Sequence, residues 1–199
     1  FILAFTNVTA AATLMIAYLM LWFIKALALN MRALQGFKIL QEHKSLDWEE
    51  LIKDLDQEDL EGKKFPKWHY NNKKRQADNP NGIYSKNIVH AVIVATYNEA
   101  REVLQPTLDD VKNSHYDKKK MIVLLAYEER GGPEVEKQAK QLMSEYADVF
   151  MVSKAIKHPK DIPHEVIGKG GNITYAAREL EKIVEKKGIN PRDVLVTTL

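Results

Sequence analysis

Residues 89–99 (VHAVIVATYNE) constrain the fold of this chain more than any other stretch. Residues 89–95 form an almost uninterrupted apolar run rich in β-branched side chains, which is typical of a strand buried on both faces of a parallel sheet. The run stops abruptly at four polar or amphipathic residues, Thr96, Tyr97, Asn98 and Glu99. Because ligands of open α/β sheets bind beyond the carboxyl ends of the strands, we expect a functional site at these four residues.

After Glu99 the sequence alternates between helical and strand patterns. The patterns predict helices over residues 102–113, 133–146 and 172–187, and strands over residues 121–127, 149–152 and 193–199. Pro106 is compatible with the first of these helices only in its first turn, and Gly188 ends the last one. Strands that alternate with helices form right-handed βαβ units, so the sequence predicts an α/β fold with a parallel sheet.

Residues 1–24 contain no charged side chain. At about 1.5 Å per residue, a helix of this length crosses a hydrocarbon core of roughly 30 Å. Tyr18 and Trp22 lie where an interfacial aromatic belt is expected, and the threonine hydroxyls are tolerated because they bond to the helix backbone. We therefore predict a transmembrane helix within residues 1–29. A signal peptide, whose apolar core is shorter, and a buried helix of a soluble protein are the alternatives.

The segment that follows this helix is basic. By the positive-inside rule, its cations place the domain after the helix in the cytoplasm; they are Lys25, Arg32, Lys38 and Lys44. The expected location is therefore the cell membrane, with a single visible span. Apolar residues recur at helical spacing between Leu27 and Leu40, so the membrane helix either continues or bends into an amphipathic helix along the headgroups.

Residues 45–86 predict a short helix and then an irregular connector. Ser45 or Asp47 can cap the helix, which is either an interface helix or an ordinary surface helix; its apolar face comprises Trp48, Leu51, Ile52 and Leu55. The connector, residues 63–86, has turn signals at Pro66, Pro80 and Asn81–Gly82. Its cations are interleaved with Trp68 and Tyr70, which fits either binding of anionic membrane lipids or a solvated linker. The predicted organisation is a membrane helix over residues 1–29, a juxtamembrane segment over 30–86 and a domain over 87–199.

Composition excludes several classes of protein. The 29 basic and 27 acidic side chains give a net charge of +2, which argues against a dedicated nucleic-acid binder. The absence of cysteine excludes disulfide scaffolds and cysteine-ligated metal sites. His158 and His164 match no zinc-binding spacing, and the prolines beside them indicate a loop. The chain begins without methionine and ends within an apolar run, so we expect it to be part of a longer protein.

A second candidate motif lies at the start of the last predicted helix. Glycines in Gly168-Lys169-Gly170-Gly171-Asn172 let backbone amides approach a ligand, and a helix amino terminus together with Lys169 favours a phosphate. Asn98, Glu99 and Glu128 offer an amide and carboxylates suited to a base or a ribose. Each of these residues also has an ordinary interpretation as a turn, cap or solvated loop residue. Their joint position at strand ends favours a nucleotide site.

These two motifs resemble those of the family 2 glycosyltransferases, especially membrane-embedded members similar to cellulose and hyaluronan synthases. The resemblance rests on V-A-T-Y-N-E-A after the first strand and G-K-G-G-N-I-T-Y-A before the long helix, and it covers residues 87–199. It implies the nucleotide-binding half of a GT-A (Rossmann-like) domain. It also implies that the nucleotide sugar contacts Thr96, Tyr97, Asn98, Glu99, Lys169, Gly170 and Asn172. Thr174 stands where the family usually has asparagine, and Glu128 is the candidate for the aspartate that reads the base.

The resemblance further implies a reaction and its requirements. Such an enzyme transfers a sugar from a nucleotide diphosphate donor to a glycan or lipid acceptor in polysaccharide biosynthesis, with inversion and with Mg²⁺ or Mn²⁺. The strand over residues 193–199 is similar to the one that leads into the family's D-x-D motif, so the metal ligands and the catalytic base are expected beyond Leu199. No catalytic or metal-binding residue is therefore predicted within this chain, and we expect the chain alone to be inactive.

Two other functions fit parts of the sequence. A membrane-tethered nucleotide-binding or scaffold domain without catalysis shares every motif named above and differs only in lacking the carboxylates. A dinucleotide-dependent oxidoreductase fits less well, because the first strand is followed by A-T-Y-N-E-A and not by G-x-G-x-x-G.

Overall fold

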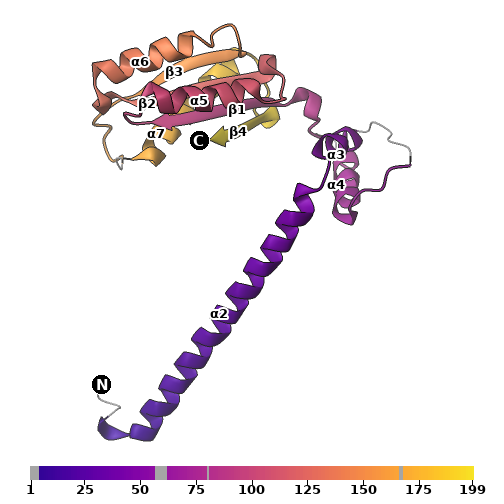
Figure 1. Cartoon of the computed structure of the whole chain (residues 1–199), viewed down its shortest axis with the longest axis vertical. Coiled ribbons are helices and arrows are strands. Elements are labelled where there is room, and N and C mark those ends of the chain that lie inside the picture. Colours follow the sequence, from indigo (N-terminus) through magenta and orange to yellow (C-terminus); the bar gives the residue numbers. More distant parts are fainter. Residues whose placement is uncertain (1–4, 57–61, 80, 166–167) are drawn as a thin grey trace. The chain divides into compact units, whose positions relative to one another are not determined.

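The computed structural model describes residues 5–56, 62–79, 81–165 and 168–199. The chain forms two compact units, Phe1–Asp54 and Leu55–Leu199. The first unit contains one long helix, and the second contains the parallel sheet and its helices (Figure 1).

Helix α2 runs without interruption over Val8–Lys44. Asn7 caps it by accepting a hydrogen bond from the backbone N–H of Ala10 at 3.0 Å, and the Thr13 hydroxyl donates to the carbonyl of Thr9 at 2.9 Å. None of its residues is buried. By length and composition α2 could cross a membrane, and of the two arrangements expected after residue 24 the structure has the continuous helix. Residues 1–4 of the predicted transmembrane segment lie outside the described residues.

Helix α3 covers Trp48–Leu55. Its cap is Asp47, whose side chain accepts a hydrogen bond from the N–H of Glu50 at 3.1 Å, whereas the Ser45 hydroxyl bonds back to the carbonyl of Glu42. Leu51 is buried, but Trp48 and Ile52 are exposed, so only part of the predicted apolar face is covered.

The connector predicted to be irregular contains a helix, and that prediction was wrong. Helix α4 covers Lys67–Ala77, follows Pro66 and ends at Asp78, whose N–H bonds to the carbonyl of Lys74 at 2.9 Å. Pro66 stands immediately before the helix, where its fixed φ is compatible with a helix start and its missing N–H costs nothing. The predicted turn signal Asn81–Gly82 lies after the end of the helix. The predicted turn residue Pro80 lies outside the described residues.

Four parallel strands form the sheet, in the order β3-β2-β1-β4. The strands are β1 (Val89–Thr96), β2 (Met121–Glu128), β3 (Val152–His158) and β4 (Val194–Thr198). The α-helices between them are α5 (Arg101–Asn113), α6 (Pro133–Ser144) and α7 (Lys169–Lys186). Short 3₁₀ helices cover Ser85–Asn87, Lys118–Lys120, Glu129–Gly131 and Pro191–Asp193. The predicted α/β fold with a parallel sheet is confirmed.

The two faces of the sheet bury separate sets of apolar side chains. Alternate residues of the central strands, such as Val92 and Val123, pack with Leu108 of α5 and Leu142 of α6. The residues between them, such as Leu124, pack against α7. Because β1 and β2 are covered on both faces, each reads as a continuous apolar run.

Two details differ from the sequence prediction. The third strand covers Val152–His158 and so begins where the predicted strand ended. The sequence did not indicate it because four of the six residues 153–158 are polar, so this edge strand lacks a continuous apolar run. Pro106 lies inside α5 and beyond its first turn. Its ring is exposed, so the backbone carbonyl that loses its helical partner lies on the solvent side.

Candidate functional site

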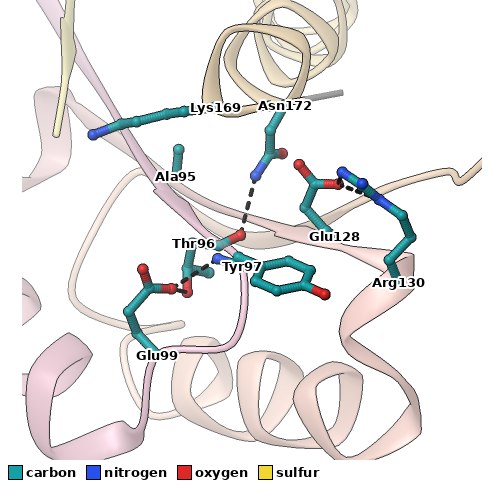
Figure 2. A pocket seen from close by; sticks show the side chains of 9 residues that line it. Ala95, Thr96, Tyr97, Glu99, Glu128, Arg130, Lys169 and Asn172 are labelled. Atoms are coloured by element: carbon teal, nitrogen blue, oxygen red, sulfur yellow. Dashed lines mark hydrogen bonds and ion pairs between the residues drawn. The ribbon is translucent and has the colours of Figure 1, made fainter. Parts of the chain in front are cut away.

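A pocket of about 270 Å³ lies at the carboxyl ends of β1 and β2, next to the start of α7 (Figure 2). Six of the eight residues predicted for the site line it: Thr96, Tyr97, Glu99, Glu128, Lys169 and Asn172. The other two line neighbouring hollows, Asn98 one beside α6 and Gly170 one beside the loop that precedes α7. The pocket thus joins the two sequence motifs, and three further residues complete its lining: Ala95, Arg130 and Gly168.

Glu99 shapes the turn that follows β1. Its Oε2 accepts hydrogen bonds from the N–H of Tyr97, at 2.7 Å, and from the hydroxyl of Thr96. The hydrogen bond from Thr96, followed by that from the Tyr97 N–H, lowers the pKa of the Glu99 carboxyl because both stabilise its ionised form. Gln138 of α6 donates to the backbone carbonyl of Glu99 at 3.0 Å, which fastens the turn to its neighbour. This carboxylate therefore holds the turn in place.

Asn172 ties α7 to the ends of both central strands. Its Nδ2 donates to the carbonyl of Thr96 at 3.1 Å (Figure 2). It also donates to the carbonyl of Ala126 at 2.9 Å, and its side chain is buried. One buried amide therefore bonds to two backbone acceptors on neighbouring strands at once. The Asn172 Oδ1 is buried and has no hydrogen-bond partner among the described residues.

Glu128 is buried at the end of β2 and is held between two cationic or ionisable groups. Arg130 bonds to its Oε2 through both Nε, at 3.1 Å, and Nη2, and the same oxygen lies 3.5 Å from Nδ1 of His158. The other ring nitrogen of His158 lies 3.1 Å from the carboxylate of Glu165. The charge of Glu128 is therefore already paired, so this carboxylate meets a ligand together with Arg130.

Arg130 also covers an aromatic ring. Its guanidinium carbon lies 5.9 Å from the centre of the Tyr97 ring, within the range of a cation–π contact, and Tyr97 itself is half exposed. Gly131 permits this approach, because a Cβ at that position would lie only 2.8 Å from the Tyr97 carbonyl oxygen. The turns after β1 and β2 therefore form one wall of the pocket.

Lys169 supplies the unpaired positive charge of the pocket. Within the part of the chain that the structure describes, no carboxylate forms an ion pair with it. It lies in the first turn of the 18-residue helix α7, whose free N–H groups add partial positive charge. Lys169 and Arg130 stand on opposite sides of Asn172 in Figure 2. The four charged side chains of the pocket sum to zero, and Lys169 is the cation among them without a carboxylate partner in the described residues; the four are Glu99, Glu128, Arg130 and Lys169.

The described residues do not offer a metal centre. No group of three or more histidine and carboxylate side chains gathers among them closely enough to hold an ion. Glu99 and Glu128, the two carboxylates of the pocket, are both bonded within the chain. His158 is the last residue of β3 and does not lie in the loop predicted for it; it stands between Glu128 and Glu165, 3.5 and 3.1 Å from their carboxylate oxygens.

Sequence reasoning missed Arg130, which lines the pocket two residues after the predicted site residue Glu128. The signal that could have identified it is the pair Gly131–Gly132 followed by Pro133, because two glycines before a helix start indicate a close approach of backbones. Ala95 and Gly168 line the pocket only as neighbours of predicted residues.

Searches of protein-family models, of curated proteins and of solved structures found no match to this chain.

Proposed function

We propose that this chain is the nucleotide-binding part of a membrane-anchored glycosyltransferase of the family 2 type, with a GT-A domain that faces the cytoplasm. The observation that carries the proposal is the pocket itself. It brings together two motifs whose residues bond directly across 76 positions of sequence, Asn172 to Thr96. The pocket lies at the strand ends where α/β folds bind ligands. The apolar helix α2 supports the anchoring part of the proposal.

The chemistry of the pocket suits a nucleotide diphosphate. Lys169 and the free N–H groups at the start of α7 would bind the diphosphate, where negative charge increases as the sugar leaves. The Tyr97 ring, with Arg130 beside it, would provide a flat platform for the base. Arg130 and Glu128 would together present donors and acceptors to polar atoms of the base or ribose. The buried Asn172 Oδ1 lacks a partner among the described residues, and a donor group of the ligand would satisfy it.

The transfer step itself is not assigned to residues of this chain. The resemblance implies a Mg²⁺ or Mn²⁺ ion and a base carboxylate, but the carboxylates of the pocket are engaged and do not form an ion site. The Leu199 carbonyl accepts a hydrogen bond from the N–H of Ala95, a residue that lines the pocket, at 3.3 Å. An Asp-x-Asp that followed Leu199 would therefore begin beside the pocket.

Donor binding tests the site directly. We expect the full chain in detergent micelles to bind at least one of UDP, GDP and ADP in isothermal titration calorimetry. Lys169→Ala should weaken that binding by roughly 10- to 100-fold, the range for loss of a hydrogen bond to a charged group. Lys186→Ala is the matched control, because it removes the same charge from the exposed last turn of the same helix. Asn98→Ala tests whether the site extends beyond the pocket, and unchanged affinity in both Lys169→Ala and Asn98→Ala would refute it.

A membrane-tethered nucleotide-binding domain without catalysis is the second candidate. The observation that favours it is that both pocket carboxylates are already bonded within the chain. The complete protein separates the two candidates. Transfer of a radiolabelled sugar by a protein that carries an acidic pair after Leu199 supports the enzyme. Nucleotide binding without transfer, in a protein with no acidic residue at that strand end, supports the tethered domain.

A further inference from the structure

Helix α4 belongs to the most basic stretch of the chain. Residues 62–77 include six cations and no acidic side chain; the cations are Lys63, Lys64, Lys67, Lys73, Lys74 and Arg75. The sequence alone allowed these residues to be a solvated linker. The structure places four of them on a helix, where side chains at fixed spacing share one side.

One side of α4 combines cations with aromatic rings. At about 100° of rotation per residue, Lys67, Lys74 and Arg75 fall within an arc of roughly 100°. Tyr70 borders this arc on one flank and Trp68 on the other, and both rings are exposed, by 48% and 37%. The opposite side carries His69, which is buried. We call Lys67, Trp68, Tyr70, Lys74 and Arg75 the basic face of α4.

The charges of this face have no counterpart within the described residues. No ion pair joins Lys67, Lys74 or Arg75 to a carboxylate in that part of the chain. Lys67 also lies in the first turn, at the positive end of the helix dipole, which disfavours a cation. Cations crowded on one face repel one another. An anionic surface would relieve both costs.

A lipid bilayer fits this face better than a soluble anion does. Tyrosine and tryptophan prefer the boundary between water and hydrocarbon, and they flank the cations as an interfacial helix requires. Residues 30–66 separate the predicted membrane helix from α4, so a chain anchored by α2 is tethered to the membrane through this segment. Clusters of four to eight cations next to a membrane helix are a known signature of binding to acidic lipids.

We propose that the basic face of α4 binds the anionic headgroups of the membrane in which α2 is anchored. The proposal rests on the anchoring part of the proposed function, and it does not depend on the nucleotide pocket. It predicts that the basic face of α4 binds to bilayers that contain phosphatidylglycerol and does not bind to bilayers of phosphatidylcholine.

Tryptophan quenching by brominated lipids tests the proposal on the full chain in vesicles. The chain has three tryptophans, Trp22 in α2, Trp48 and Trp68. A variant that retains only Trp68 reports contact of the basic face with lipids brominated near the headgroup. A variant that retains only Trp22 reports whether α2 is in the bilayer. The remaining tryptophans are changed to phenylalanine in each case, and the vesicles contain phosphatidylcholine with or without phosphatidylglycerol.

We expect Trp22 to be quenched in both bilayers and Trp68 only in the anionic one. The triple variant Lys67→Gln, Lys74→Gln, Arg75→Gln should return Trp68 quenching to its level in neutral bilayers, because three lost cations weaken surface binding by roughly 100-fold. Glutamine keeps the helix propensity of lysine and arginine. The matched control changes Lys112, Lys137 and Lys186, which are exposed on α5, α6 and α7, to glutamine and should leave Trp68 quenching intact.

Three outcomes would overturn the proposal, and they have separate meanings. Trp68 unquenched in both bilayers, with Trp22 quenched, means that the basic face is covered within the chain; the acidic residues Asp54, Asp56, Glu58, Asp59 and Glu61 precede it in the sequence. Equal quenching of Trp68 in both bilayers means that the contact does not depend on lipid charge. Trp22 unquenched in both means that α2 is not in the bilayer, and the anchoring part of the proposed function then fails with it.

Discussion

Helix α2 and strand β2 are the two most apolar parts of this molecule, and the chain treats them in opposite ways. All eight residues of β2 are buried, between β1, β3 and the helices on both faces. None of the 37 residues of α2 is buried. An apolar sequence therefore indicates that a segment avoids contact with water. It does not indicate whether the chain's own side chains or another molecule will cover that segment. Strand β2 is buried by neighbouring strands and helices of the same chain, whereas no part of the described chain buries α2.

The magnitudes make the contrast sharper. Burial of a large aliphatic side chain such as Leu124 contributes about 1.5–3 kcal/mol to folding, so β2 is a major source of the stability of the sheet. The exposed leucine, isoleucine, methionine and aromatic side chains of α2 contribute nothing of this kind within the chain. Soluble monomers rarely expose continuous apolar patches larger than a few hundred Å². By length and composition α2 could cross a membrane, where lipid would take the place of water.

The largest effect is expected from a charge placed in β2. Leu124 is fully buried against α7, so Leu124→Asp should cost more than about 4 kcal/mol and abolish the cooperative unfolding transition of the sheet in calorimetry. The chain should nevertheless remain in the membrane fraction, because α2 is unchanged. A retained transition at the wild-type temperature would show that β2 is not the core strand described above.

A charge at the centre of the apolar part of α2 should have the converse effect. Ile16→Asp should weaken membrane insertion by about 2.5–3.5 kcal/mol and increase the share of chain released by alkaline extraction. The unfolding transition of the sheet should not move. If instead the sheet is destabilised and extraction is unchanged, α2 is covered by protein, and the interpretation as a soluble buried helix is correct.

The smallest effect is expected at Glu99, a polar group at the end of the buried region. Its pKa is lower in the folded chain than its ordinary value near 4.5, so its contribution to stability is fully present above that value. The contribution is lost as the pH falls through the lower pKa of the folded state. Glu99→Gln should therefore lower the free energy of unfolding at pH 7, by less than about 1 kcal/mol because the group is exposed. The difference from wild type should shrink as the pH falls below 4.5, and a difference that grows on acidification would contradict this assignment.

The parts of the fold that were predictable are those in which one physical signal dominates. Strands β1 and β2 were located to within one residue, since burial on both faces leaves an unbroken apolar run. Strand β3 was misplaced because it lies at a sheet edge and has no continuous apolar run, and α4 was missed because a polar, basic helix has no apolar period. Local sequence patterns therefore carry little information on an edge strand such as β3 or on a polar helix such as α4.

The site shows the same division. Six predicted residues line one pocket because a parallel sheet brings its strand ends and the following helix start to a single edge. The roles of these residues were not visible in the sequence. Glu128 requires Arg130 beside it, and Asn172 bonds to carbonyls that belong to two different strands. Such contacts depend on backbone geometry over long separations in sequence.

The two hydrogen bonds of Asn172 link the pocket to the register in which β1 and β2 pair. Its two acceptors, the carbonyls of Thr96 and Ala126, are in reach together only when β1 and β2 pair with Ala95 opposite Ala126. A slip of one residue would move one carbonyl by about 3.3 Å, beyond the reach of the amide. Any ligand of this pocket would therefore bind only chains whose strands are in register. At 100 times its dissociation constant it would favour them by about 2.7 kcal/mol, and so act as a selective aid to folding.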